Sequence, residues 1–440
     1  MKKAILILML LAVLAGNVSA LDAERKVMDN GLIVLHSQRT NLPMVVVNLL
    51  IKASPLDVDA KKAGLADLTA GMLSEGTGRR TAEQISEEVE FIGAAIGADA
   101  DDDYTTISMS VLKKDIDKGF DVFTDVLLNP VFPSKELENM QGRIVGSIRQ
   151  SEEDPQYIAG VEFGKAVFGE HPYGRPVSGS VESVTVISRS DLVGFHRKYY
   201  APNNSILSVV GDISSDELMD IMKKYFSGWT RRDIPMRPTY EVSVIDSPKI
   251  IKIDRELTQA NIVLGHIGIE RKDPDYHAVS VMNFILGGGG FSSRLMQRVR
   301  DELGLAYDVH SFFMSAKQKG YFQAGVQTKN EAANKVIREI LVQIERMISE
   351  DVSKEELDGA KAYLTGSFPR RLDTMSKLSG LLAQVEFYGL GMSYEKDYIA
   401  GINKVTIEDV RRVANKYLYP DRYVLVVVAD QDKAGIKDSP

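Results

Sequence analysis

An arginine and a tyrosine, Arg300 and Tyr307, lie seven residues apart in the C-terminal part of the chain. Apolar residues at every fourth position predict a helix that is capped by Ser292–Ser293 and ends at Gly304, so Tyr307 should open the strand that follows. An arginine offers planar charged donors and a tyrosine a hydroxyl donor on a rigid ring, so the pair could donate hydrogen bonds to an electron-rich group. On spacing alone, a solvated arginine and a core tyrosine are the favoured interpretation.

The residues that commonly bind metals are few and scattered. The chain has no cysteine, and no two of its histidines share a helical ligand spacing: His36, His171, His196, His266, His277 and His310. A catalytic zinc usually needs three protein ligands. The aspartate run at 101–103 is most simply a solvated loop. We therefore expect no metal and no cofactor in this chain.

Four consecutive glycines, Gly287, Gly288, Gly289 and Gly290, could in principle cradle a phosphate with their amides. The run lacks the Gly-Lys-Ser/Thr ending of a phosphate loop and the G-x-G-x-x-G spacing of a dinucleotide site. Nucleotide binding is therefore disfavoured. A loop at the end of a helix, with no role in binding, is the simpler interpretation.

The composition is that of a soluble globular protein with more than one domain. The chain has 440 residues, of which 44% are hydrophobic and 26% charged, with a net charge of −8. Without cysteine there can be no disulfide, no thiolate metal site and no cysteine nucleophile. The negative charge argues against a broad nucleic-acid-binding surface.

The first 20 residues resemble a bacterial signal peptide. Lys2 and Lys3 form a positive start, an apolar run covers 4–15, and Val18-Ser19-Ala20 offers small residues for cleavage after Ala20. The apolar run is too short to cross a bilayer comfortably. We expect a mature chain without a membrane span in the periplasm or outside the cell.

The rest of the chain is similar to itself at an offset of about 220 residues. The motif KYYAP (198–202) precedes the apolar run 206–212, and KYLYP (416–420) precedes the apolar run 423–430; SKEL (134–137) likewise resembles SKEEL (353–357). We therefore expect two homologous domains, at 21–230 and 247–440, joined by an exposed linker at 231–246.

Strand and helix patterns alternate within each half. Residues 32–35, 44–51, 105–111 and 321–328 are predicted strands, and 60–74, 82–92 and 115–128 are predicted helices. Polar and apolar residues alternate in 104–111 and 321–328, as in a sheet with one covered face. The pattern indicates an α+β class, with helices packed on one side of an antiparallel sheet in each half.

Six motifs together resemble the M16 (pitrilysin, insulinase-like) metallopeptidase family, in its subfamily of half-length chains that act in pairs. They occur in the order of that family and span nearly the whole mature chain: KAGLAD (62–67), HPYGRPVSG (171–179), YAPNN (200–204), GD (211–212), GGGGFSSRL (287–295) and GLAY (304–307). The resemblance implies two homologous α+β domains that face each other like half of a clamshell.

The resemblance also implies that the zinc motif of this family is erased here. Active members carry His-x-x-Glu-His, with a further glutamate downstream, so that two histidines and a glutamate bind zinc and the other glutamate activates water. The corresponding positions are Asp67, Ala70 and Gly71, and Ser147 lies about where the third ligand would be. We expect no catalytic zinc in this chain.

The family's non-zinc half carries an Arg/Tyr pair, which Arg300 and Tyr307 match. The resemblance implies that this pair binds the substrate backbone and the developing oxyanion, and that Gly287–Gly290 form a loop at the substrate entrance. The expected function is the non-zinc subunit of a two-chain peptidase, whose homologous His-x-x-Glu-His partner holds the zinc and which cleaves peptides. An inert scaffold subunit, like the related core proteins of respiratory complexes, and a peptide-binding module are the alternatives.

Overall fold

The computed structural model describes residues 21–242 and 245–438. The expected signal peptide therefore lies outside the described residues. In the described part, no helix has both the length and the apolar character that crossing a bilayer requires.

The N-terminal half is built on a six-stranded sheet in the order β1-β2-β6-β3-β5-β4. The strands predicted near 32–35, 44–51 and 105–111 are all present. The strands are β1 (Glu24–Val27), β2 (Ile33–Gln38), β3 (Met44–Ile51), β4 (Ala95–Ala100), β5 (Thr105–Leu112) and β6 (Ser205–Gly211).

Most helices of this half pack on the outer face of that sheet and share one apolar core with it. The buried residues of β5 alternate along the strand, as the sequence pattern predicts, whereas β3 is buried on both faces. The helices are α2 (Leu65–Gly71), α3 (Ala82–Phe91), α4 (Ile116–Leu128), α5 (Ser134–Ser151), α6 (Pro155–Phe168), α7 (Val181–Thr185), α8 (Arg189–Tyr199) and α9 (Ser215–Phe226).

The C-terminal half has a five-stranded sheet in the order β7-β11-β8-β10-β9. Its strands are β7 (Lys249–Asp254), β8 (Gln259–Ile267), β9 (Ala306–Met314), β10 (Tyr321–Lys329) and β11 (Val424–Ala429). Its helices are α10 (Tyr276–Asn283), α11 (Ala333–Ser349), α12 (Lys354–Gly366), α13 (Met375–Tyr388), α14 (Tyr394–Lys404), α15 (Ile407–Tyr417) and α16 (Gln431–Ala434).

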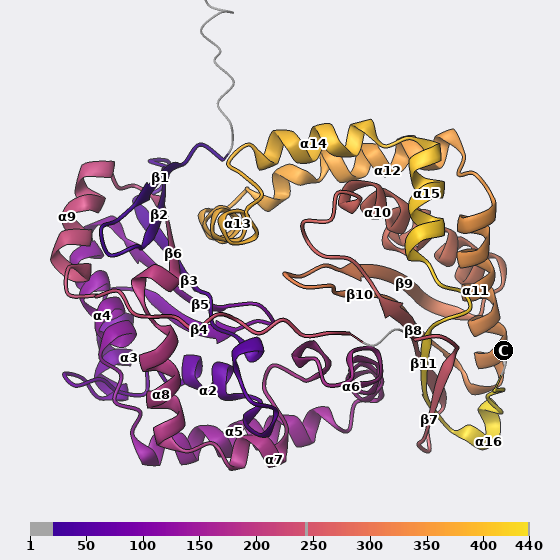
Figure 1. Ribbon diagram of the computed structural model, residues 1–440, viewed down its shortest axis with the longest axis horizontal. Helices are drawn as coiled ribbons and strands as arrows, with labels where there is room; N and C mark the ends of the chain where they lie inside the picture. Colours follow the sequence, from indigo (N-terminus) through magenta and orange to yellow (C-terminus); the bar gives the residue numbers. More distant parts are fainter. Residues whose placement is uncertain (1–20, 243–244, 439–440) are drawn as a thin grey trace, which may run out of the picture.

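The two sheets repeat one topology. The order β2-β6-β3-β5-β4 corresponds strand for strand to β7-β11-β8-β10-β9, and the parallel pair β2/β6 recurs as β7/β11. All other neighbouring strands are antiparallel. The two halves stand opposite each other with their sheets facing inward (Figure 1). The α+β class and the duplication are thus confirmed, with one parallel pair in each sheet.

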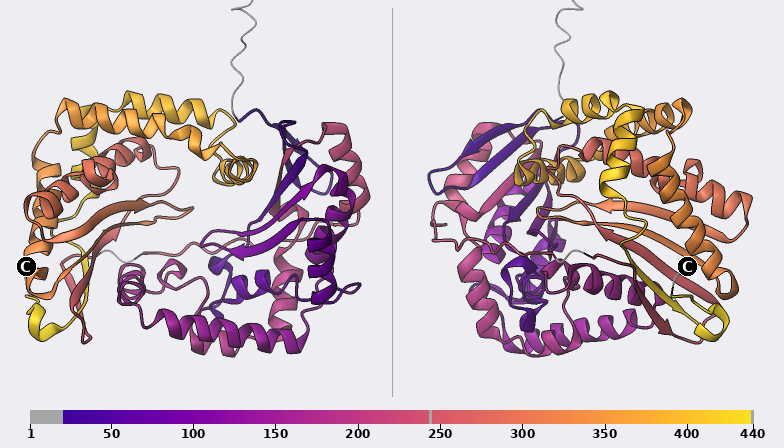
Figure 2. Two further views of the ribbon diagram at one scale, coloured as in Figure 1. Left: turned by 180° about the vertical axis from the view of Figure 1, so that it is seen from behind. Right: turned by 45° about the vertical axis from the view of Figure 1, so that its right-hand side comes forward.

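One helix from each half packs on the inner face of the other half's sheet. Helix α6 packs on β8 and β11, where Phe163 and Val167 join Val263 and Val426 in one core. Helix α13 packs on β3 and β6 of the N-terminal sheet. Both views in Figure 2 show these helices between the two halves. The helices are therefore not confined to one side of each sheet, because one helix from the opposite half covers part of the inner face.

The helix predicted over 60–74 is shorter than expected. A single turn covers Ala60–Lys62, and α2 begins only at Leu65. Gly64 lies between them with φ of 96°, and a Cβ there would come within 2.7 Å of the Ser178 carbonyl oxygen. The close approach of the 171–179 loop interrupts the helix at this glycine.

Asp103, from the aspartate run that the sequence assigned to a solvated loop, and His171, from the 171–179 motif, are buried between the halves. Asp103 is 2% exposed and accepts hydrogen bonds from the Tyr173 hydroxyl, from the Lys317 amide at 2.7 Å and from the Tyr388 hydroxyl at 3.0 Å. His171 is 1% exposed, and its Nε2 lies 3.1 Å from Gln318 Oε1. The expectation of a solvated aspartate loop is therefore wrong for Asp103, since three donors from both halves converge on its carboxylate.

The linker is extended, but it is bonded along its length rather than free in solvent. Arg237 forms an ion pair with Asp57 at 2.7 Å and donates to the Asp103 carbonyl at 3.0 Å. Arg232 donates to the carbonyls of Arg197 and Tyr200. The segment thus lies along the N-terminal half, and most of its described residues are exposed.

Candidate functional site

Arg300 lies on a helical segment with unusually wide turns. From Met296 to Glu302 the helix is of the π type, and the Leu303 amide accordingly bonds to the Arg298 carbonyl at 3.2 Å. The expected cap is present, since Ser293 Oγ accepts from the Met296 amide at 3.4 Å. Short π segments recur at functional sites in other proteins.

The structure brings Arg300 and Tyr307 into contact at the surface. The guanidinium carbon lies 5.2 Å from the centre of the Tyr307 ring and 4.5 Å from that of Phe291. Tyr307 is 85% exposed and Phe291 66% exposed. The alternative of a core tyrosine is therefore wrong. Two rings hold the arginine in place by cation–π contact, while the tyrosine hydroxyl remains open to a ligand.

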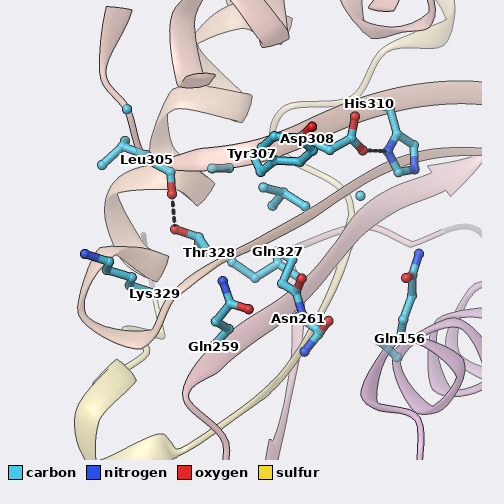
Figure 3. Close-up of a pocket in the computed structure, with 16 residues that line it drawn as sticks. Gln156, Gln259, Asn261, Leu305, Tyr307, Asp308, His310, Gln327, Thr328 and Lys329 are labelled. Carbon is cyan, nitrogen blue, oxygen red and sulfur yellow. Dashed lines mark hydrogen bonds and ion pairs between the residues drawn. The ribbon is translucent and has the colours of Figure 1, made fainter. Parts of the chain in front are cut away.

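Tyr307 stands at one end of a cavity of about 460 Å³ on the inner face of the C-terminal sheet. Figure 3 shows side-chain amides beneath it: Gln259 and Asn261 from β8, Gln327 from β10, and Gln156 from the first turn of α6. Asp308 Oδ2 and His310 Nδ1 are 2.8 Å apart at the β9 side. Thr328 donates to the Leu305 carbonyl at 2.6 Å, which ties β10 to the turn before Tyr307.

The glycine run is a compact turn. Gly287 is buried at the end of a π-helical extension of α10, and a Cβ on it would lie 2.6 Å from the Ser311 amide nitrogen. Close packing against Ser311 explains why this buried position is a glycine. Gly288 and Gly290 are exposed and Gly289 partly so. A role at the substrate entrance stays a prediction for these three.

The degenerate zinc positions do not form a metal site. Asp67 accepts only a long bond of 3.4 Å from the Ala100 amide, and burial, followed by the charge of Asp99, raises its pKa. Ala70 is buried and has no donor atom, and a side chain at Gly71 would meet the Met140 methyl. Ser147 is exposed on α5. One carboxylate and one hydroxyl do not make the three-ligand set that zinc needs.

No group of three or more histidine, aspartate or glutamate side chains gathers as a metal site anywhere in 21–242 and 245–438. Several histidines have structural partners instead. His196 Nε2 lies 2.8 Å from the Leu127 carbonyl, and burial lowers its pKa to about 4. His266 is likewise buried with a pKa lowered to about 4, and its Nδ1 lies 2.9 Å from the Ile267 carbonyl.

Two family models match the chain in succession. The model described as Insulinase (Peptidase family M16) matches residues 33–180, and the model described as Peptidase M16 inactive domain matches residues 187–364. The two matches thus cover most of both halves.

The chain is also similar to whole proteins of this kind. It is 28% identical over 417 residues to an uncharacterized zinc protease of Mycobacterium tuberculosis, covering 94% of each chain. It is 24% identical over 432 residues to the non-peptidase homolog YmxG of Helicobacter pylori, covering 98% of this chain and 99% of the other. A crystal structure of a peptidase M16 inactive domain from Pseudomonas fluorescens superposes with a TM-score of 0.87 at 29% identity, covering 93% of this chain and 98% of that one.

The amides of the cavity were missed by sequence reasoning. Gln259 and Asn261 are polar residues at alternate positions of a strand that is otherwise buried, and Gln327 is an exposed position of β10. A polar pair at i and i+2 in an apolar strand signals a face that meets solvent or a ligand. That signal alone does not show that residues from β8, β10 and α6 meet in one cavity.

Proposed function

Because the chain belongs to the M16 (insulinase) peptidase family, we propose that it is the non-zinc subunit of a two-chain M16 peptidase. In this role it closes the chamber over the partner's zinc site and supplies Arg300 and Tyr307. The zinc and the general base belong to a homologous subunit with an intact His-x-x-Glu-His motif.

The observation that carries the proposal is the contrast between the two halves. The degenerate zinc position offers only Asp67 and Ser147, whereas Arg300 and Tyr307 lie together at the surface with the tyrosine hydroxyl exposed. Both side chains donate hydrogen bonds, and a positive charge beside a hydroxyl donor suits a peptide carbonyl that gains negative charge during attack. The expected signal peptide adds that this peptidase acts in the periplasm or outside the cell.

The test begins with the partner. Native mass spectrometry with metal counting, on the mature chain purified from its source cells, should find a second chain of similar mass and one zinc per pair. A homodimer or monomer without zinc would contradict the proposed pairing.

The reconstituted pair then allows the roles of Arg300 and Tyr307 to be measured. If each donates to the oxyanion, Arg300→Ala and Tyr307→Phe should lower kcat by roughly 10²–10³-fold. Tyr363→Phe is the matched control, because Tyr363 is also an exposed tyrosine and its ring packs against that of Phe284 rather than against the arginine. A stable pair whose kcat and KM are unchanged by both variants would refute the catalytic role and support the scaffold alternative.

A further inference from the structure

A second cavity, of about 290 Å³, lies where the two halves meet, and two opposite charges line it without pairing. They are Asp102, from the turn between β4 and β5, and Arg175, from the loop after α6. Both side chains are half-buried, and among the described residues neither has a hydrogen bond or an ion pair. Charged groups at such positions are normally paired, so the cavity leaves a carboxylate and a guanidinium free for a bound molecule.

Asp102 differs from its neighbour Asp103 in having no donor. Three donors converge on the Asp103 carboxylate, which is therefore fully used by the protein. The Asp102 carboxylate instead acts on another residue of the cavity lining, because burial, followed by the charge of Asp102, raises the pKa of Tyr321. This carboxylate is thus close to the aromatic wall of the cavity.

That wall consists of rings from both halves. Phe163 and Phe168 of α6 lie with their ring centres 5.7 Å and 6.1 Å from that of Tyr321 on β10. The ring centre of Tyr173 lies 5.7 Å from that of Phe168. A Cβ at Gly160, which also lines the cavity, would meet nothing within 4 Å, so the space is open there. Such a wall suits an apolar or aromatic group, and the ring faces also attract an ammonium group.

We propose that this cavity binds a free α-amino acid with an apolar or aromatic side chain. Its ammonium group pairs with Asp102, its carboxylate pairs with the planar donors of Arg175, and its side chain packs among the rings. A residue within a peptide chain carries neither of these charges and a terminal residue carries only one, so a free amino acid alone satisfies both. The inference goes beyond the proposed function, since it requires neither a partner subunit nor zinc.

The test is isothermal titration calorimetry of the mature chain with L-phenylalanine. Burial, followed by the charges of Asp101 and Asp103, raises the pKa of Asp102 to about 7, so a buffer at about pH 8 keeps its carboxylate ionised. We expect one site per chain. Asp102→Asn and Arg175→Gln should each raise Kd at least about 10-fold, because each removes one contact between opposite charges.

The matched controls are Asp220→Asn on α9 and Arg149→Gln on α5. Both residues are exposed and lie outside the cavity lining, so Kd should not change. Urea unfolding of each variant shows whether it keeps the stability of the native chain. A Kd that is the same in Asp102→Asn, Arg175→Gln and the native chain would overturn the proposal.

A second measurement uses the native chain alone and so does not depend on how the variants fold. N-acetyl-L-phenylalanine lacks the ammonium group and L-phenylalaninamide lacks the carboxylate, so each should bind at least about 10-fold more weakly than L-phenylalanine. Free glycine keeps both charges but has no side chain to bury, and it should also bind at least about 10-fold more weakly. Equal affinity for the blocked analogues, or no heat beyond that of dilution up to the solubility limit of L-phenylalanine, would overturn the proposal.

Discussion

One substitution at Asp103 can test how much the contacts between the two halves contribute to the stability of the chain. Its carboxylate accepts from Tyr173 in the N-terminal half and from Lys317 and Tyr388 in the C-terminal half. Burial, followed by this carboxylate, raises the pKa of Tyr173, so its hydroxyl stays protonated and remains a donor. Asp103→Ala removes the acceptor from three donors at once.

The expected loss follows from the exposure of those donors. Hydrogen bonds to charged groups contribute about 1.5–3 kcal/mol each. The Tyr173 hydroxyl is buried and keeps an unsatisfied donor, whereas the Lys317 amide and the Tyr388 hydroxyl are on half-exposed or exposed residues that water can reach. We therefore expect Asp103→Ala to lower the free energy of unfolding by about 3–5 kcal/mol, less than the sum of three bonds.

The assay is urea unfolding of the mature chain, followed by the fluorescence of Trp229, its single tryptophan. Trp229 is 3% exposed, so unfolding should change its emission. Asp101→Ala is the matched control, since Asp101 is an exposed aspartate of the same run and should lose no more than about 1 kcal/mol. Equal losses in the two variants would show that Asp103 does not hold the halves together.

Three further outcomes are expected in the same unfolding assay. Gly287→Ala should destabilise the chain by about 1–3 kcal/mol, because its methyl group would overlap the Ser311 backbone. Gly146→Ala, in open space on α5, should instead stabilise it by about 0.5–1 kcal/mol. If both variants changed the free energy of unfolding in the same direction, the packing argument would be wrong. Burial, with the charges of neighbouring aspartates, raises the pKa of Asp102 to about 7, so the folded state holds a proton that the unfolded state releases near pH 4. The native chain should therefore lose up to about 1.4 kcal/mol per pH unit relative to Asp102→Asn as pH rises from about 4 to 7, and parallel pH profiles would refute this. Phe163→Ala should cost about 3–5 kcal/mol in one cooperative transition, since this ring joins the two halves, and two separate transitions would show independent halves.

The sequence predicts most of the helices and strands well, but it does not predict which sheet each helix packs on. Residues 105–112 form a strand in which burial alternates with a clear period of two, and 44–51 form a strand that is apolar along nearly its whole length. The helix at 82–91 agrees with the helix predicted over 82–92. The 60–74 pattern fails at Gly64, because the loop that approaches this glycine is distant in sequence. Periodicity shows that a helix has an apolar side but not which sheet covers it, so the exchange of α6 and α13 could not be foreseen.

At the candidate site, too, the sequence predicts the local structure but not the contacts between side chains. The spacing of Arg300 and Tyr307 indicates a helix, a turn and a strand, but only the structure shows that the tyrosine is exposed and in contact with the arginine. The buried Asp103 carboxylate accepts hydrogen bonds from residues 173, 317 and 388. These residues are distant in sequence, so no local pattern could reveal the contacts. Three consecutive aspartates look solvated until a distant segment covers one of them.

The exchanged helices α6 and α13 restrict how this molecule can move. Since each sheet has its inner face partly covered by a helix from the other half, the two halves cannot swing apart without pulling both helices out of apolar cores. Hinge motions occur where few contacts cross between the moving parts, and here two cores and the Asp103 cluster cross. The chain should therefore act as one rigid shell. In the proposed pair, a peptide would enter by displacement of one whole subunit against the other, and the timing of that opening would be set by the contacts between subunits.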